Sequence, residues 1–342
     1  MKNKTYYYGL DLIRFFAAFW VMNRHYFSAF DNNVTWFDLS KYGLLGVPLF
    51  FIVSGFVISE SLSVSSIKNF AISRFIRLAP IFWIICTATY IFTLIMPNGN
   101  PVSIPEYLVS MSMLGDNFGA LFHLSRTVDI VYWSLAVEII FYFAIALFVY
   151  LFKWKNIRWF LFGWLLISIS AFYFNLDQTF IAKMLLVRHA SYFIFGAILS
   201  LIVNEVTTRK QKYLDCVLLL VTAIYSTIIS TKVFSSYLDV NNMNSKMVTL
   251  FHILFFITTI FLIYVSKYIK GRLQKIFMIL GGLTYPLYLI HQTVGSILID
   301  YFKNYGTEIT RPFVMIIFMI IISYFVYKQD KKLRSYLKTK LI

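Results

Sequence analysis

Charged residues are scarce in this sequence. Only 13% of the 342 residues carry a charge, whereas 59% are hydrophobic and 20% are aromatic. A soluble domain of this length needs roughly 25% charged residues to cover its surface, so the composition excludes a soluble globular protein. Long apolar runs recur from residue 8 to residue 327. They predict a single integral membrane domain over residues 1–342, with spans from about 8 to 328 and a basic cytoplasmic tail at 329–342.

Acidic residues are rarer than basic ones. Fifteen Asp and Glu stand against 31 Lys and Arg, which gives a formal net charge of +16. In a soluble protein this excess would suggest nucleic acid. In a membrane protein, Lys and Arg collect in cytoplasmic loops and meet anionic lipid headgroups. We therefore expect membrane lipids as partners and no nucleic acid.

Several motifs are missing. The two cysteines, Cys86 and Cys216, both lie in apolar runs, which favours small core residues over a disulfide. No Gly-rich phosphate loop occurs, and Ser54-Gly55-Phe56 lacks the surroundings of a nucleophile elbow. No histidine pair has the spacing of a metal site with supporting ligands. The sequence predicts no metal and no tightly bound cofactor.

The apolar runs predict an all-α, polytopic helix bundle. A bilayer-spanning helix needs about 20 mostly apolar residues. About ten segments meet this criterion, near residues 8–30, 43–62, 77–96, 131–152, 158–174, 189–204, 213–230, 248–267, 277–300 and 312–328.

The basic residues predict the orientation of the spans. Of the 31 Lys and Arg, 21 fall in the segments on one side and eight on the other, and Arg14 and Arg24 lie inside the first span. Lys and Arg are enriched on the cytoplasmic side. Both termini are therefore expected in the cytoplasm, and the proline-containing segment 97–130 outside.

Two ionisable residues share one face of the first span. Arg14 and His25 are eleven positions apart, which is three helical turns plus roughly 20°. Their separation along the axis is about 16 Å. Ionisable groups within spans are costly and usually face the bundle interior, so both are functional candidates. Alternatively, Arg14 reaches the headgroups and His25 is satisfied by a backbone carbonyl.

Two arginines precede the third expected span. Arg74 and Arg77 are three residues apart within Ser73-Arg74-Phe75-Ile76-Arg77-Leu78-Ala79-Pro80, so they share one side of a helix. At a helix N-terminus, two guanidinium groups suit phosphate binding. The alternative is the ordinary enrichment of basic residues at the cytoplasmic side.

A carboxylate and a further histidine lie at similar expected depth. Glu138 follows Trp133-Ser134 early in the fourth span, about 10 Å below the outer surface. His291 closes Tyr288-Leu289-Ile290-His291 in the ninth span. Both also suit structural hydrogen bonds between spans. Gly281-Gly282 and Pro286 offer a place where the ninth span breaks. The remaining histidines, His123, His189 and His252, are weaker candidates.

These elements, in this order, resemble acyltransferase family 3, a family of membrane enzymes that O-acylate polysaccharides, peptidoglycan and other glycosides. The resemblance covers nearly the whole chain and is carried by Arg14 to His25, Gly46 to Phe56 with Ser54, Arg74-x-x-Arg77, Trp133-Ser134-Leu135-x-x-Glu138, Tyr288-Leu289-x-His291, and Phe195-Gly196-Ala197 after Arg188. Two positions depart from the family's pattern: Arg24 precedes His25, and Pro48 stands where an acidic residue is common.

The resemblance implies an acyl-CoA co-substrate, most often acetyl-CoA, from the cytoplasm and a glycan or lipid-linked glycan acceptor. It implies O-acetylation of a bacterial surface polysaccharide such as the O-antigen of lipopolysaccharide, in the bacterial cytoplasmic (inner) membrane. The extracytoplasmic esterase-like domain of some relatives is not expected. Arg74, Arg77 and Arg14 would bind the donor phosphates. The catalytic set would be His25, Glu138 and Arg14, with Glu138 fixing the tautomer of His25.

Two mechanisms stay open at this point: His25 as a general base or as an acylated relay. His291, Tyr288, Ser54, Trp133, Ser134 and Arg188 would contact the acceptor or support the fold. The competing function is a transporter or flippase of a lipid-linked or acylated glycan, because ten spans with interior charges also suit one.

Overall fold

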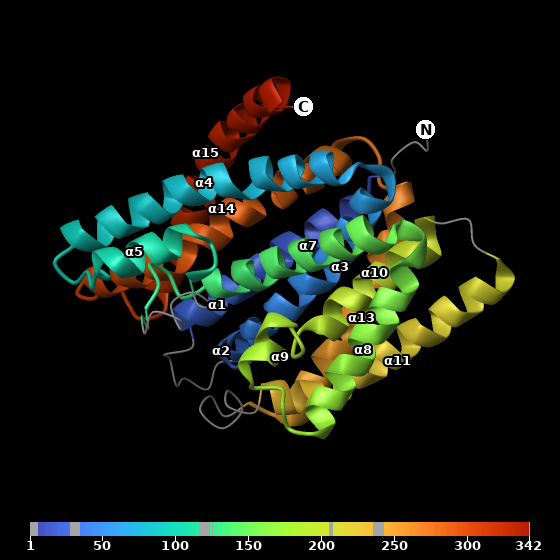
Figure 1. The fold of residues 1–342 in the computed structure, drawn as a ribbon. Helices are drawn as coiled ribbons and strands as arrows, with labels where there is room; N and C mark the ends of the chain where they lie inside the picture. The colour runs from blue at the N-terminus through green and yellow to red at the C-terminus, as the bar shows by residue number, and fades with distance from the viewer. Residues whose placement is uncertain are drawn as a thin grey trace. The chain divides into compact units, whose positions relative to one another are not determined.

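The computed structural model describes residues 6–27, 35–115, 124, 126–204, 208–234 and 243–341. Within these residues the chain is helical and contains no strand (Figure 1), which confirms the all-α prediction. The α-helices are α1 Tyr8–Phe27, α2 Thr35–Ser40, α3 Gly46–Val64, α4 Ile67–Ile95, α5 Ile104–Met111, α7 Tyr132–Phe152, α8 Ile157–Tyr173, α9 Phe180–Met184, α10 Ala190–Asn204, α11 Arg209–Val233, α13 Ser245–Val265, α14 Arg272–Tyr301 and α15 Thr310–Leu341. Short 3₁₀ turns occupy Lys41–Leu45, Trp154–Asn156 and Ser266–Tyr268.

Eight helices in the described parts of the chain are long and apolar enough to cross a membrane: α3 with the residues before it, α4, α7, α8, α11, α13, α14 and α15. The other two expected spans are helical but differ in character. The helix α1 contains Asp11, Arg14 and Arg24 within its 20 residues, and α10 has only 15 residues. The chain is a polytopic, multi-pass membrane protein.

Three boundaries differ from the sequence prediction. The helix α4 begins at Ile67, ten residues before the expected span. Gly281-Gly282 and Pro286 do not interrupt α14, which runs unbroken from Arg272 to Tyr301. The expected basic tail is not a separate segment, because α15 continues to Leu341. An apolar run marks only the part of a helix that is suited to lipid. The helix itself can continue beyond the run through charged residues.

The described helices divide between two compact units that interleave along the chain. Unit 1 comprises Met1–Ala17, Leu45–Ile67 and Ile140–Phe277, and unit 2 comprises Ala18–Leu44, Lys68–Ile139 and Met278–Ile342. Four helices contribute residues to both units: α1, α7 and α14, and α4 through its first residue, Ile67.

In unit 1, α3 and α10 pack closely because each helix presents a glycine to the other. A Cβ on Gly55 would lie 2.1 Å from the Phe193 carbonyl oxygen, and a Cβ on Gly196 would lie 1.9 Å from that of Ile52. Small residues let membrane helices approach at the backbone. Beside this contact, Phe193 stacks on Phe51 with ring centroids 4.7 Å apart.

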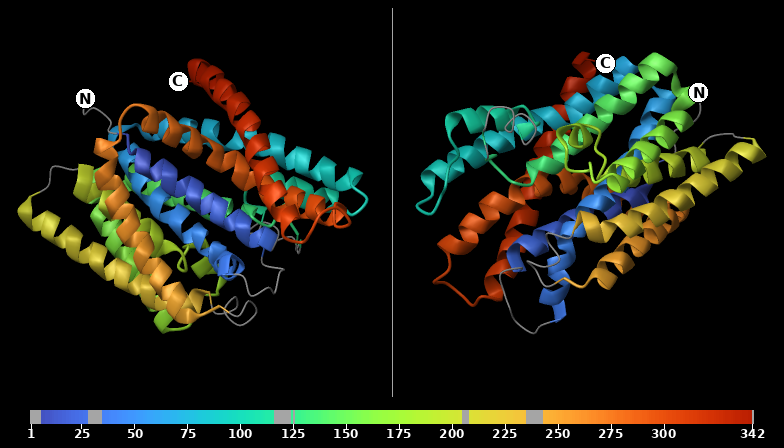
Figure 2. Two further views of the ribbon diagram at one scale, coloured as in Figure 1. Left: turned by 180° about the vertical axis from the view of Figure 1, so that it is seen from behind. Right: turned by 60° about the horizontal axis from the view of Figure 1, so that its bottom comes forward.

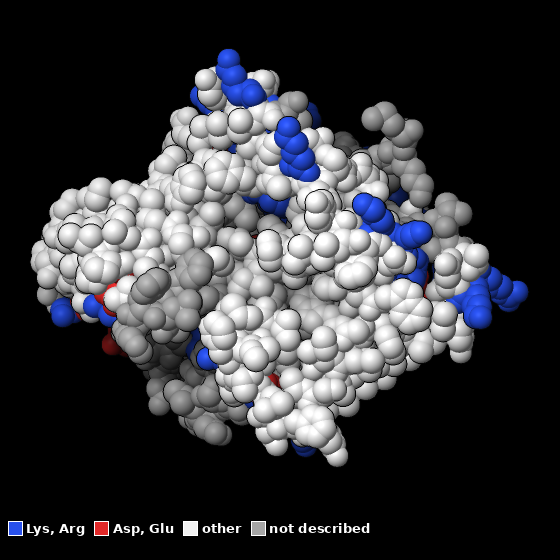
Figure 3. All heavy atoms as spheres, viewed as in Figure 1, with Lys and Arg blue, Asp and Glu red and all other residues white. Residues whose placement is uncertain are grey.

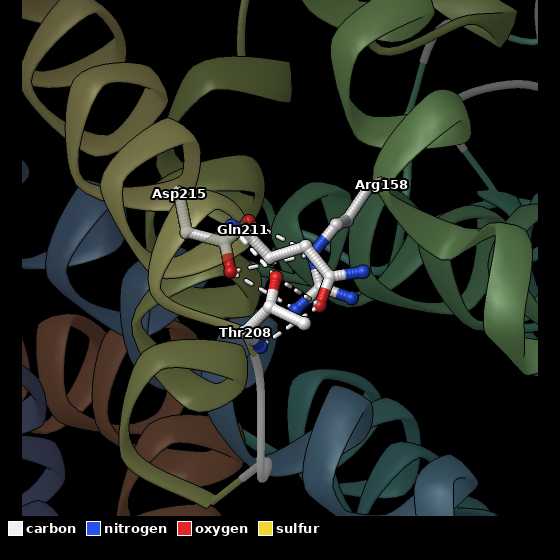
Figure 4. A network of polar contacts seen from close by, with 4 residues as sticks. All are labelled: Arg158, Thr208, Gln211 and Asp215. Carbon is white, nitrogen blue, oxygen red and sulfur yellow. Dashed lines mark hydrogen bonds and ion pairs between the residues drawn. The ribbon is translucent and has the colours of Figure 1, made fainter.

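Polar contacts in unit 1 also fix the start of α11 (Figure 4). Thr208 accepts from the Gln211 amide, and Gln211 accepts in return from the Thr208 amide, which is a capping box. One turn later the buried Asp215 carboxylate accepts two bonds of 2.9 Å from Arg158 of α8. A bidentate pair satisfies both groups, so Arg158 and Asp215 join α8 to α11.

In unit 2, the short helix α5 packs on α4, and both views in Figure 2 show them side by side. Trp83 Nε1 donates to the Met111 carbonyl at 2.9 Å, and the rings of Tyr90 and Tyr107 stack at 4.5 Å. The helices α14 and α15 also meet: a Cβ on Gly282 would lie 2.2 Å from a ring carbon of Tyr327.

The surface carries many large apolar side chains. On the face drawn in Figure 3, most atoms belong to uncharged residues, and Lys and Arg atoms appear in separate patches. Leu220, Phe261 and Val314 are each at least 60% exposed, as expected where lipid replaces water. Both cysteines are free; Cys86 is buried as predicted, but Cys216 is exposed. The prediction of a core position for Cys216 was wrong, since an apolar run has a lipid-facing side as well as a buried one.

Candidate functional site

Two histidines that are far apart in the sequence meet in unit 2. The rings of His25 on α1 and His291 on α14 have their centroids 5.3 Å apart. His291 is fully buried, and His25 is half-buried. The two histidines singled out from the sequence therefore form one imidazole pair.

The hydrogen bonds of His291 define its tautomer. Its Nδ1 lies 3.0 Å from the Tyr288 carbonyl and 3.2 Å from the Leu287 carbonyl. Carbonyls only accept, so Nδ1 carries the proton and Nε2 keeps its lone pair. This Nε2 is buried and has no hydrogen-bond partner among the described residues. A buried acceptor without a partner is costly, and such an atom is suited to receiving a proton.

His252 of unit 1 provides a contrast. Its Nδ1 lies 2.7 Å from the Val248 carbonyl, and its Nε2 lies 2.9 Å from the Tyr192 hydroxyl. Both ring nitrogens are satisfied, so His252 is a structural histidine.

A second polar pair adjoins the imidazoles. The Ser134 hydroxyl on α7 lies 2.7 Å from the Tyr288 hydroxyl on α14, and both residues are buried. The Tyr288 ring centroid is 5.7 Å from that of His291. Two of the motifs read from the sequence, Trp133-Ser134 and Tyr288 to His291, thus meet through hydroxyl groups.

Asp129 joins the start of α7 to α14. Its carboxylate accepts from the Val131 amide at 3.0 Å and from the Thr293 amide at 2.9 Å. Burial raises the pKa of this carboxyl to about 6, although these hydrogen bonds oppose the shift. The Tyr26 hydroxyl donates to the His291 carbonyl at 2.6 Å, and Gly295 leaves space for that hydroxyl, since a Cβ there would lie 2.0 Å from it. Asp129 and Tyr26 therefore hold α14 at His291 and just after it.

Neither residue was identified from the sequence. Asp129 stands three residues before α7, outside the N-cap position that favours acidic residues, so its place in the sequence carried no capping signal. Nothing in the sequence distinguishes Tyr26 from the other 23 tyrosines.

The other predicted residues of unit 2 are positioned as follows. Glu138 is half-buried on α7, close enough to Tyr288 for its charge to act on that hydroxyl. The ring contact that the structure gives His25 is with His291, and the pairing of Glu138 with His25 stays a prediction. Arg74 lies over the Phe70 ring at 5.6 Å. Because α4 begins at Ile67, Arg74 and Arg77 lie beyond its first turn, so the expectation that they stand at a helix N-terminus was wrong.

Three predicted residues belong to unit 1. Arg14 is half-buried on α1, and Ser54 is buried on α3 beside Gly55. Arg188 precedes α10, lies 3.7 Å from the buried Asp177 carboxylate and donates to the Val233 carbonyl at 3.0 Å. Arg188 is thus engaged within its own unit. His123 lies outside the described residues. Within the described ranges, no group of three His, Cys, Asp or Glu residues is placed to hold a metal ion.

Apolar helices of membrane-spanning length and an imidazole pair flanked by hydroxyls define a membrane protein with an interior polar site. The acyltransferase family 3 model, described as an acyltransferase domain, matches residues 7–328. The chain therefore belongs to acyltransferase family 3 and is a membrane acyltransferase, as the resemblance indicated. No curated protein sequence and no solved structure matches it.

Proposed function

We propose that this membrane acyltransferase moves an acetyl group from acetyl-CoA to a sugar hydroxyl of a bacterial surface polysaccharide, such as the O-antigen of lipopolysaccharide, at the cytoplasmic membrane. The observation that carries the proposal is the pair formed by His25 and His291, in which the Nε2 of His291 has no hydrogen-bond partner in the described part of the chain. Two imidazolium charges at this distance would repel each other in a buried site. The pair therefore works with at least one neutral imidazole, which is the form a general base requires.

The chemistry would proceed as follows. The neutral imidazole of His25 takes the proton of the sugar hydroxyl while the hydroxyl oxygen attacks the thioester carbonyl. The C–S bond then breaks, and the thiolate of CoA receives that proton back from the imidazolium. A positioned general base typically contributes about 10²- to 10⁴-fold to the rate. The acyl-histidine relay, in which the imidazole itself receives the acetyl group first, requires the same residue.

The donor side of the proposal rests on the arginines. Arg74, Arg77 and Arg14 would hold the phosphates of acetyl-CoA near the cytoplasmic end, since guanidinium groups bind phosphate in a bidentate manner. The apolar interior would take the pantetheine arm. Acetyl-CoA would be consumed as a co-substrate, and the acceptor would arrive as a glycan or a lipid-linked glycan.

The experiment is an ester measurement in the host. A deletion strain is complemented with wild type, His25→Ala or His252→Gln, and the acetyl content of its surface polysaccharide is measured by proton NMR. We expect acetyl signals with wild type and His252→Gln and none with His25→Ala. The His252 variant is the control, because it removes a histidine whose two ring nitrogens are both satisfied within unit 1.

Two results would contradict the proposal. Full acetylation in the strain that carries His25→Ala would rule out His25 as the catalytic residue. An unchanged acetyl content in the deletion strain would rule out this polysaccharide as the acceptor. Turnover of acetyl-CoA by the purified protein would then indicate an enzyme with another acceptor. No turnover would favour a transporter, which consumes no acetyl-CoA.

A further inference from the structure

A charged cluster lies where α4, α14 and α15 meet within unit 2. The Tyr285 hydroxyl on α14 donates to the Leu78 carbonyl on α4 at 3.2 Å. One turn earlier on α14, Gly282 receives the Tyr327 ring of α15. These two contacts bring Arg77, which precedes Leu78, to the same level as the residues that follow Tyr327.

The acidic residue at that level is Asp330. It is 1% exposed, and its carboxylate forms an ion pair with Arg334 one turn further along α15. The charge of Arg77 acts on both Asp330 and Arg334. The charges of two guanidinium groups from two helices thus act on one buried carboxylate, which leaves an excess of positive charge.

Such an excess is suited to an anion. Removing a charge from water costs several kcal/mol unless an opposite charge compensates it. One carboxylate cannot satisfy two guanidinium forks, whose donors suit a second planar or tetrahedral anion. Arg74 lies one turn before Arg77 and Arg334 one turn after Asp330, so the basic residues of α4 and α15 extend toward the same end of the two helices.

We propose that Arg334 binds a phosphate group of the acyl donor together with Arg77, and that Asp330 holds Arg334 in position. This inference rests on the proposed use of acetyl-CoA and extends the donor site from α4 to α15. It assigns a role in binding to a segment that the sequence presents as a basic tail.

The test uses the full chain in lipid nanodiscs and measures turnover as a function of acetyl-CoA concentration. In Arg334→Gln we expect the donor KM to rise about tenfold while kcat changes less than twofold, because the residue binds the donor away from the reacting atoms. Arg334→Lys keeps the charge but loses the fork, so its KM should lie between the two. Lys332→Gln is the matched control, an exposed basic residue of the same helix, and should leave KM unchanged.

Arg334→Gln leaves Asp330 buried without its partner, which risks misfolding. The double variant Asp330→Asn/Arg334→Gln removes both charges and avoids this. A raised donor KM in the double variant supports the inference, and a wild-type KM there overturns it while leaving the proposed function intact. If the wild-type protein neither binds CoA in a calorimeter nor turns over acetyl-CoA, the proposed donor fails and this inference fails with it.

Discussion

His25 and His291 are best treated as one titrating pair, because the protonation of one imidazole affects that of its neighbour. The His291 tautomer is fixed by two backbone carbonyls, which directs its lone pair away from the α14 backbone. His291→Asn keeps a donor for those carbonyls and lacks the Nε2 acceptor. We expect this variant to lower kcat about tenfold to 100-fold, within the range for acid–base groups, with an unchanged donor KM.

The control for this prediction is His252→Asn in unit 1. It breaks the hydrogen bond to Tyr192, so it should cost about 1 kcal/mol of stability and preserve kcat. Steady-state turnover of acetyl-CoA by both purified variants provides the measurement. Equal kcat values for the two variants would assign His291 a structural role only.

Asp129 gives stability a dependence on pH. Its folded-state pKa is raised from the ordinary 3.8 to about 6 by burial, so the folded protein holds this proton more tightly than the unfolded chain. The stabilising contribution is complete below about pH 3.8 and is lost as the pH rises through about 6. The contribution of Asp129 to thermal stability should therefore fall between pH 5 and pH 7.

Asp129→Asn should remove this loss, since the amide does not titrate in that range. The comparison is the change of Tm between pH 5 and pH 7 for the two proteins, followed by tryptophan fluorescence in detergent. The same pH dependence in both proteins would show that another group is responsible.

At the scale of helices, the close approach of α3 and α10 depends on two glycines. Gly196→Ala would place a methyl group against the Ile52 carbonyl and the Phe56 amide, and backbone atoms cannot move aside as a side chain can. We expect a loss of about 1–3 kcal/mol, as for other overpacked interiors, seen as a lower Tm.

Gly163→Ala on α8 is the matched control. A Cβ there meets nothing within 4 Å, so only helix propensity changes, and the substitution should raise stability by roughly 0.5–1 kcal/mol. A neutral Gly196→Ala would mean that the two helices are able to separate without cost.

Helix existence was predictable from apolar length, whereas helix ends were not. Apolar runs located α7 within one residue of its start at Tyr132, because the run and the helix begin together there. They missed the first ten residues of α4, where Lys68 and Arg74 interrupt the run but not the helix. Hydrogen bonding continues as long as the backbone allows, and Ser65-Ser66 rather than the charges separates α3 from α4.

For the site, too, the sequence predicted features along single helices but not the contacts between helices. Depth counting along single helices brought His25 and His291 to a similar level, and the structure pairs them. Counting does not reveal which helices are neighbours, so the bonds from Tyr26 and Asp129 to α14 remained invisible. The pairing of Asp330 with Arg334 was hidden for another reason: the segment read as a tail is helical, which places residues four apart on one face.

At the scale of the whole molecule, the number of helices that cross the membrane decides which side each loop faces. Ten crossings place residue 100 outside. If α1 and the 15-residue α10 both lay along the interface, the eight remaining candidate spans would make residue 100 cytoplasmic while residues 270, 305 and 339 kept their sides. We expect α1 to cross, since its charged residues can be satisfied inside a bundle. In a variant without Cys86 and Cys216, an impermeant maleimide should label Asn100→Cys and Tyr305→Cys in intact spheroplasts. Lys270→Cys and Thr339→Cys should react only after lysis. Labelling of residue 100 only after lysis, with the other three as expected, would contradict the crossing of α1. Arg14 and His25 would then not lie at different depths of the membrane, and the proposed path of the donor from Arg14 to His25 would lose its basis.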